Sequence, residues 1–261
     1  APTLDPTMTS SCGIFEREDS TLEEASVAKI DRLCRMLRLG PGDHLLEIGT
    51  GWGAFAIHAA GRYGCRVTTS TISRAQHQLA TERVARAGLQ GRVTVLLDDY
   101  RDLRGRHDKL VSVEMLEAVG AERYREFFAR CSVLLEPHGL AAIQVITIAD
   151  QRYQQARRGV DFVKRWVFPG SSIPSVTALL DAATAGSDLR LRHLEEIGPH
   201  YARTLASWRE NLARNREAVE RITTPRFRRL WHYYLCYCEA GFAEGYNGDV
   251  QMLFARPRAG R

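Results

Sequence analysis

The chain has 261 residues, 44% of them hydrophobic and 26% charged, with a formal net charge of +5 at pH 7. These values fit one α/β domain with a sizeable core, and no apolar run reaches the length of a membrane span. The six cysteines form no regular disulfide or zinc framework, so we expect reduced thiols in a cytoplasm and predict no metal site.

The chain opens with a polar, irregular segment over residues 1–15, which we expect to lie across the domain. A capping-box pattern in Ser20-Thr-Leu-Glu-Glu24 predicts a helix over residues 21–39. Strand and helix signals then alternate, with strands at residues 45–48, 66–70, 92–97, 109–113 and 140–147, and helices at 52–62, 73–87 and 121–135. Such alternation predicts a doubly wound, mostly parallel sheet that binds ligands at the carboxyl ends of its strands.

The alternation breaks over residues 148–176, where charged and aromatic residues precede a cluster of Pro, Gly and Ser. An insertion this long inside a compact domain predicts a helical lid. Two further helices with a strand at residues 189–197 between them, and an antiparallel strand at 250–255 that closes the sheet, bring the strand count to seven. We therefore predict one domain over 1–261, with an N-terminal segment and helix (1–40), a ligand-binding core (41–147), a lid (148–176), and C-terminal helices with the closing strand (177–261).

Three glycines, Gly49, Gly51 and Gly53, connect the first strand to the next helix. Glycines allow a tight turn and let a ligand lie against main-chain N–H groups at the helix start. The spacing Gly-x-Gly-x-Gly, with Glu47 two residues earlier, differs from the Gly-x-Gly-x-x-Gly of dinucleotide sites. An acid beside the loop suits a ligand with an amine and a sulfonium, so we predict S-adenosylmethionine; a generic glycine-rich turn is the alternative.

Several further segments carry recognisable motifs: Ser11-Cys-Gly-Ile-Phe-Glu-Arg17, Thr71-Ile-Ser-Arg-Ala-Gln76, Asp99-Tyr-Arg-Asp102, Ser112-Val-Glu-Met-Leu-Glu-Ala-Val-Gly120, Phe168-Pro-Gly170 with Pro174-Ser175, and Pro199-His-Tyr-Ala-Arg-Thr-Leu-Ala-Ser-Trp208. In this order they resemble the cyclopropane fatty acid synthase family of methyltransferases, which includes the mycolic acid cyclopropane synthases. The resemblance spans nearly the whole chain, and we expect the family's usual N-terminal part to precede it. It implies a Rossmann-like class I methyltransferase fold. It also implies methyl transfer from S-adenosylmethionine to a cis double bond of a lipid acyl chain, followed by proton loss from a carbocation to close a cyclopropane ring.

The resemblance assigns the proton acceptor to a bicarbonate ion held by a Cys, a Glu, a His and a Tyr. Residue by residue, the Cys is Cys12, the Glu is Glu117 and the Tyr is Tyr201, whereas the His falls on Gln144. Glutamine can hydrogen-bond an anion but carries no positive charge. Ala118, where many members have His, is a second departure, so Glu117 is open to an alternative role as the base itself or as a ligand of another anion or a water.

Without the resemblance, these residues have ordinary interpretations. Cys12 is typical of a small buried hydrophobe, Glu117 of an acid at a helix start, and Tyr201 of amphipathic cover. Gln144 is less ordinary, because an amide in an apolar strand requires partners.

The predicted cofactor contacts are Ser10, Glu47, Gly49, Gly51, Thr71, Gln76, Asp99 and Tyr100. Gly49 and Gly51 are expected at the methionine and ribose end. Thr71 and Gln76 follow the second strand, where methyltransferases bind ribose hydroxyls, although Ser73-x-x-Gln76 is also a capping box. The acid and the ring of residues 99–100 are expected to bind the adenine amine and cover the base, with a surface turn as the alternative. Ser10 aligns with a family Tyr that reaches the cofactor, so this contact is expected to be weaker.

We therefore predict a cyclopropane-forming C-methyltransferase that acts on unsaturated phospholipid or another acyl lipid. Arginines crowd residues 203–229, and a basic protein can dock transiently on an anionic membrane surface, here the inner face; a solvated helical face is the alternative. No nucleic-acid motif is present, and a homodimer is left open. The competing functions are methyl transfer that yields a methylene- or methyl-branched chain, C-methylation of a small metabolite, and a non-enzymatic lipid- or cofactor-binding module.

Overall fold

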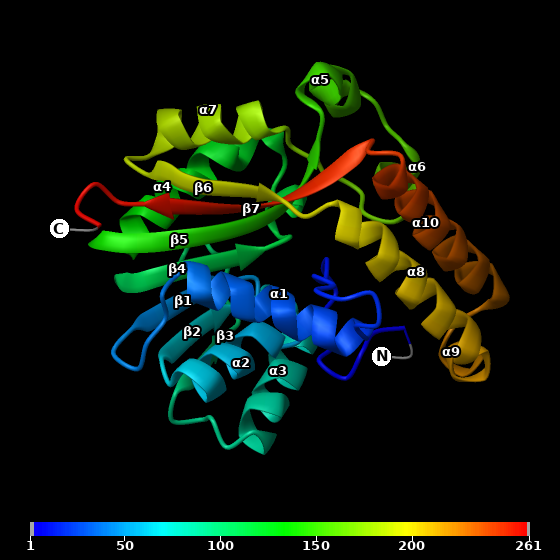
Figure 1. Cartoon of the computed structure of the whole chain (residues 1–261), viewed down its shortest axis with the longest axis horizontal. Coiled ribbons are helices and arrows are strands. Elements are labelled where there is room, and N and C mark those ends of the chain that lie inside the picture. Colours follow the sequence, from blue (N-terminus) through cyan, green and yellow to red (C-terminus); the bar gives the residue numbers. More distant parts are fainter. Residues whose placement is uncertain (1–2, 260–261) are drawn as a thin grey trace.

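A computed structural model describes residues 3–259 of the chain; residues 1–2 and 260–261, the ends of the first and last predicted segments, lie outside the described residues. Within the described part, seven strands form a single sheet: β1 (His44–Ile48), β2 (Arg66–Ser70), β3 (Val93–Leu96), β4 (His107–Val113), β5 (Leu135–Ile148), β6 (Arg190–Glu196) and β7 (Asn247–Ala255). Their spatial order is β3-β2-β1-β4-β5-β7-β6 (Figure 1). The first five strands are parallel, and β7 runs antiparallel to both β5 and β6. The predicted fold class is confirmed.

The helices have the bounds α1 (Leu22–Met36), α2 (Ala54–Tyr63), α3 (Arg74–Arg86), α4 (Tyr124–Leu134), α5 (Asp150–Arg158), α6 (Phe162–Trp166), α7 (Val176–Gly186), α8 (Pro199–Arg214), α9 (Arg216–Ile222) and α10 (Pro225–Ala243). α1 begins at the predicted capping box, in which Thr21 and Glu24 cap each other's backbone N–H groups. Ser73 likewise caps α3 through the backbone N–H of Gln76.

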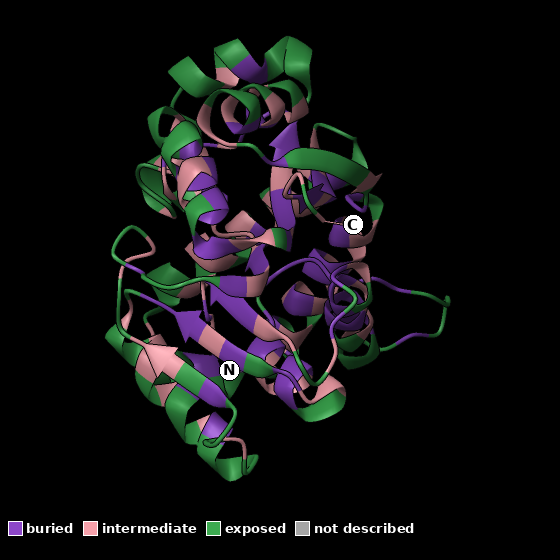
Figure 2. Ribbon diagram, turned by 90° about the vertical axis from the view of Figure 1, so that its left-hand side faces the viewer, coloured by how far each residue is buried: buried purple, intermediate pink, exposed green. Residues whose placement is uncertain are grey.

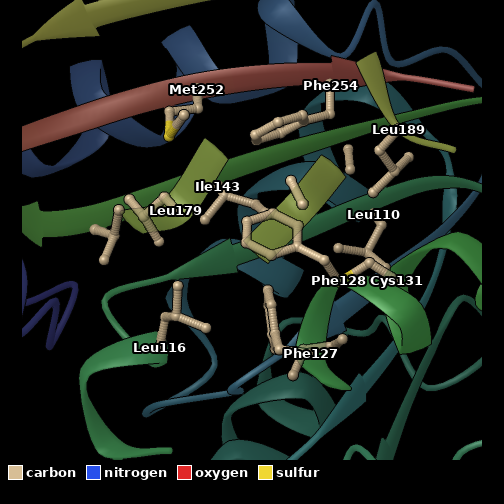
Figure 3. Packing of buried hydrophobic residues seen from close by; sticks show 14 of the residues in the cluster. Leu110, Leu116, Phe127, Phe128, Cys131, Ile143, Leu179, Leu189, Met252 and Phe254 are labelled. Carbon is tan, nitrogen blue, oxygen red and sulfur yellow. The ribbon is translucent and has the colours of Figure 1, made fainter. Parts of the chain in front are cut away.

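Helices cover both faces of the sheet. Consecutive residues of a strand point to opposite faces, and in the central strands both sets of side chains are apolar and buried. Leu45 of β1 packs in a core cluster with α1 and α2, whereas the next residue, Leu46, packs in a cluster with α4 and α7. In the second cluster the rings of Phe128 and Phe254 meet edge to face with centroids 5.4 Å apart (Figure 3). Figure 2 shows the buried strands lying between helices whose outer surfaces are exposed.

One predicted detail of the C-terminal part is wrong. One helix was expected after β6, but α8, α9 and α10 follow it, because Asn215 ends the first and Pro225 can start a new helix at its first position. The predicted antiparallel strand at residues 250–255 is present as β7, and it lies between β5 and β6. Its side chains are buried on both faces, whereas β6 is mostly exposed, so β6 is the strand that suits an edge. β5 also begins at Leu135, five residues before the predicted start.

Two segments lie over the carboxyl ends of the parallel strands. The N-terminal segment is held by Arg83, whose guanidinium donates to the carbonyls of Thr7 (2.8 Å) and Trp52 (2.6 Å). The insertion at 148–176 forms α5 and α6, and the ring of Phe162 lies 4.6 Å from that of Tyr233 on α10 (Figure 1). The insertion then returns to the sheet, where Ser172 N–H donates to the carbonyl of Glu117 at 2.8 Å.

Candidate active site

A cavity of about 190 Å³ lies at the carboxyl ends of β1 and β4, where the chain order of the sheet reverses. Its walls are the glycine loop after β1, residues 8–11 of the N-terminal segment, and the residues that follow β4. Gly49 has φ +99°, and a Cβ atom there would lie 3.2 Å from the side chain of Met115, so the loop requires glycine at this position. A larger groove of about 510 Å³, between the N-terminal segment, α1 and α2, is lined by other residues than those predicted.

Glu47 is the buried acid of this cavity, with 3% of its surface exposed. Its Oε2 atom has no hydrogen-bond partner among the described residues. Burial raises the pKa of this carboxyl to about 8, although a hydrogen bond from Thr69 and the charge of Lys29 oppose the shift. A buried carboxylate with a free oxygen favours a ligand that brings a positive charge or a donor, so the cavity fits S-adenosylmethionine.

The structure brings most of the predicted cofactor residues to this cavity. The lining includes Ser10, Glu47, Gly49, Gly51 and Gln76. Thr71 lies beside them, because its Oγ1 donates to Gln76 Oε1 at 2.8 Å.

Asp99 and Tyr100 do not line this cavity. The Asp99 carboxylate accepts two hydrogen bonds from the Arg101 guanidinium, at 2.8 and 2.9 Å. The ring of Tyr100 packs edge to face on Phe127, with centroids 5.7 Å apart. Their predicted contact with adenine stays a prediction.

Glu114, directly after β4, is a carboxylate that hydrogen-bonds to three of the four predicted catalytic residues. Its Oε1 accepts the backbone N–H of Cys12 at 2.8 Å and the Gln144 amide at 2.9 Å. Its Oε2 accepts the Tyr201 hydroxyl at 2.5 Å. The residue adopts φ +46°, which is rare for a side chain other than glycine.

The side-chain amide of Gln144, on β5, hydrogen-bonds to Glu114 and to two residues of β7. Besides Glu114, its amide nitrogen donates to Asp249 Oδ2 at 2.9 Å, and its Oε1 accepts from the Gln251 amide at 3.0 Å. Burial and the charge of Glu114 raise the pKa of Asp249 well above its ordinary value. Gln144 therefore connects Asp249 to Glu114.

Glu117 contacts none of the other three predicted catalytic residues by hydrogen bond in the described structure. Its Oε1 accepts the backbone N–H of Ile146 at 2.6 Å, and its Oε2 is buried without a hydrogen-bond partner among the described residues. Burial, together with the negative charge of Glu114, raises the pKa of Glu117 to about 8. At neutral pH it is therefore mostly protonated.

These contacts leave bicarbonate without donors. Cys12 N–H, the Tyr201 hydroxyl and both amide hydrogens of Gln144 already donate to Glu114 or Asp249. The Cys12 thiol faces backbone carbonyls, and burial raises its pKa well above the ordinary value, so it offers no anion site. A second anion beside Glu114 would also be repelled, so these residues do not fit bicarbonate.

The cluster contains residues that sequence reasoning missed: Glu114, Asp249 and Lys29. Lys29 is 2% exposed on α1 and donates to Ser11 Oγ at 2.7 Å; burial lowers its pKa, and the charge of Glu114 opposes this most strongly. One signal for Glu114 was available, because an acid that directly follows a buried parallel strand lies at the ligand-binding edge of the sheet.

The parallel sheet, the glycine loop and the buried acid before it define a class I S-adenosylmethionine-dependent methyltransferase fold. A sequence model of the family described as mycolic acid cyclopropane synthetase matches residues 1–252, and the chain belongs to this family, as its motifs predicted.

Relatives agree with this assignment. The chain is 40% identical over 261 residues to the tuberculostearic acid methyltransferase UfaA1 of Mycobacterium tuberculosis, covering 97% of this chain and 61% of the relative. It is 33% identical to the cyclopropane mycolic acid synthase MmaA2 of the same species, covering 97% and 91%. The solved structure of mycolic acid cyclopropane synthase CmaA1 complexed with SAH and CTAB has a TM-score of 0.90 at 31% identity, covering 97% and 91%. The chain spans only 61% of the length of UfaA1, and 66% of that of a 35% identical relative from Pseudomonas putida.

Proposed function

We propose that the protein transfers the methyl group of S-adenosylmethionine to a cis double bond in the acyl chain of a lipid. One observation carries the proposal: Glu114 lines the cofactor cavity and, on its other side, contacts two members of an apolar cluster. A group placed between a sulfonium site and an apolar site suits a reaction between a sulfonium and an alkene.

The apolar cluster is formed by the N-terminal segment, α8 and α10 around Tyr201. The rings of Tyr201 and Phe242 stack with centroids 4.3 Å apart, and Trp208 meets Tyr201 edge to face at 6.2 Å. An alkene is a weak nucleophile, so the reaction needs a site that excludes water and holds the reactants in line. Aromatic walls next to Glu114 supply such surroundings for an acyl chain.

Bound S-adenosylmethionine would supply the methyl group, which leaves a positive charge on the acyl chain. The partly buried Glu114 lines the same cavity as two buried groups, Glu47 and Lys29. Fixed negative charge in a partly dry site stabilises a developing cation without reorganisation of solvent. The chain's own contribution is therefore electrostatic, together with a base that removes a proton.

The site supports two products. Loss of a proton from the added methyl group closes a cyclopropane ring; if a hydride first shifts from the methylated carbon to the neighbouring cation, the same loss gives a methylene branch. Two observations favour the second product: the 40% identity to a tuberculostearic acid methyltransferase, and the surroundings of the proton acceptor, where Gln144 and Ala118 stand in place of histidines.

We further propose that the lid segment 150–168 docks on an anionic membrane. Its exposed apolar side chains are Val160, Trp166 and Phe168, which are 72%, 54% and 49% exposed. The same segment carries five Lys or Arg and two Asp. Aromatic side chains among basic ones suit the interface of an anionic bilayer. None of the described helices is long and apolar enough to cross a membrane.

The test is incubation of purified protein with methyl-labelled S-adenosylmethionine and vesicles of cis-unsaturated anionic phospholipid, followed by proton NMR of the extracted lipid. Upfield ring protons would identify the cyclopropane, and vinylidene protons the methylene product. Vesicles of saturated phospholipid are the control and should acquire no label. If no label enters unsaturated lipid while the cofactor still binds, the proposal fails and a small-molecule acceptor takes its place.

A further inference from the structure

We propose that Glu114 is the built-in base of this active site and replaces a diffusible bicarbonate ion. The inference rests on the proposed methyl transfer to an alkene, because it concerns the proton that this reaction must lose. It rests on the three hydrogen bonds that the Glu114 carboxylate accepts.

The Glu114 carboxylate occupies the hydrogen-bond donors that were predicted to hold bicarbonate. It accepts hydrogen bonds of 2.5 to 2.9 Å from the backbone N–H of Cys12, the side-chain amide of Gln144 and the hydroxyl of Tyr201. All three residues were predicted to bind bicarbonate. Together these donors fix both carboxylate oxygens, one on each side of the group. A base held by fixed donors beside the substrate needs no binding step of its own.

The unusual backbone conformation of Glu114 supports a functional role for this residue. Its φ of +46° lies in the left-handed region, which side chains other than glycine rarely adopt. Such conformations persist where the surroundings determine them, and they gather at functional sites. Here the backbone geometry aims the carboxylate toward Tyr201 and the cofactor cavity.

The proton transfer is balanced within this site. When the sulfur–methyl bond breaks, the π pair of the alkene forms the new carbon–carbon bond and the other alkene carbon becomes a cation. A carboxylate oxygen of Glu114 then takes a proton from the added methyl group. The released C–H pair closes the ring or, after a hydride shift, forms the methylene double bond. Glu114 becomes neutral and returns its proton to water when the product leaves.

The neighbouring acids are less suited to this step. Glu117 points one oxygen at the backbone N–H of Ile146, and burial raises its pKa to about 8, so at neutral pH it mostly carries a proton already. Asp249 is buried behind Gln144, and its pKa is raised further by the charge of Glu114. Glu114 alone combines ligands for both oxygens with a place in the lining of the cofactor cavity.

The test is a comparison of Glu114→Gly with Glu114→Gln. Glycine accepts the observed φ without strain and leaves the Cys12 N–H, the Gln144 amide and the Tyr201 hydroxyl free to hold an added anion. Glutamine keeps the shape but is not a base. We expect wild-type turnover to be the same in bicarbonate-free buffer and with added bicarbonate. Both variants should lose about 10²–10⁴-fold in turnover without bicarbonate, and only Glu114→Gly should recover when it is added.

Binding measurements complete the test. Carbon-13 NMR of labelled bicarbonate should show a bound ion with Glu114→Gly and none with the wild type. Calorimetry should show that both variants bind S-adenosylmethionine like the wild type, and Glu217→Gln, an exposed glutamate on α9, should leave turnover unchanged. The inference is overturned if wild-type turnover requires bicarbonate, if Glu114→Gln is fully active, or if Glu114→Gly binds bicarbonate without recovery. Absence of label in lipid with the wild type would instead refute the proposed function.

Discussion

Two carboxylates at neighbouring strand ends have opposite surroundings. Glu47, near the end of strand β1 and before the glycine loop, is buried with an oxygen that has no hydrogen-bond partner among the described residues. Glu114, after β4, is only partly buried, yet both of its oxygens accept hydrogen bonds. The first arrangement is incomplete without a ligand and suits binding. The second is complete without one, as expected of a catalytic group that must be in position before the substrate arrives.

If this distinction holds, substitutions around Glu114 should lower turnover at constant cofactor affinity. Apart from the Glu114 variants, the largest effect is expected for Tyr201→Phe, which removes the hydrogen-bond donor to Glu114 Oε2. A hydrogen bond to a charged group contributes about 1.5–3 kcal/mol, so we expect a loss of roughly 10–100-fold in kcat. Single-turnover label transfer and calorimetry would measure the two quantities. Tyr246→Phe, at an exposed site, is the control; an equal loss in cofactor affinity would contradict the distinction.

Substitution of Glu47 should have the opposite signature. Glu47→Gln keeps the shape of the side chain but removes the carboxyl group, which can ionise when a positively charged cofactor enters the cavity. We expect the Kd for S-adenosylmethionine to rise about tenfold, the low end for an interaction with a charged group. Turnover at saturating cofactor should stay within a few-fold of the wild type. A large loss of kcat with unchanged Kd would show that Glu47 acts in catalysis instead.

A smaller change is expected for Arg83→Met, which acts on the cofactor side through the backbone. Arg83 joins the glycine loop to the N-terminal segment by hydrogen bonds to the carbonyls of Trp52 and Thr7. Loss of neutral-acceptor hydrogen bonds of about 1 kcal/mol each should weaken cofactor binding several-fold. Arg86→Met, on the exposed side of the same helix, provides the matched control, and equal affinities of the two variants would refute the role.

A further effect is expected on stability in the absence of cofactor, rather than on turnover or affinity. The folded-state pKa of Glu47 is raised from 4.5 to about 8, so the folded protein holds this proton more tightly than the unfolded chain. The stability that this provides is complete below pH 4.5 and is lost as the pH rises through 8. Glutamine does not ionise, so the Glu47→Gln variant should keep its stability as the pH rises. Its Tm should therefore exceed that of the wild type by an amount that grows between pH 5 and 8, at about 2–4 °C per kcal/mol of free energy of unfolding. Thermal scans at several pH values would measure it; a constant difference would contradict the raised pKa.

The cofactor side could be predicted from local sequence because its signals lie close together. The three glycines, Glu47 and the strand before them occupy one short stretch, and the caps of α1 and α3 depend on residues three apart. The sequence does not predict the ion pair between Asp99 and Arg101, because an acid after a strand can face either a ligand or a nearby basic side chain.

The acid cluster could be predicted only in part. The family resemblance indicates Cys12, Gln144 and Tyr201, but it does not indicate Glu114, which accepts hydrogen bonds from all three. Their contacts join residues 30 to 102 positions apart and require a positive φ at residue 114 that no local pattern reveals. Asp249 reaches Gln144 only because β7 lies between β5 and β6, a position that the sequence did not indicate.

The place of β7 in the sheet also bears on how the protein is made. The glycine loop and the first four strands leave the ribosome long before β7, and domains fold largely in the order of synthesis. Until β7 is available, β5 and β6 are separated by an unfilled gap, and β5 presents an unpaired edge of a kind that promotes aggregation. The nascent chain can therefore build the part that contains the glycine loop early, while the last strand fills the gap in the sheet and brings Asp249 and Gln251 to Gln144.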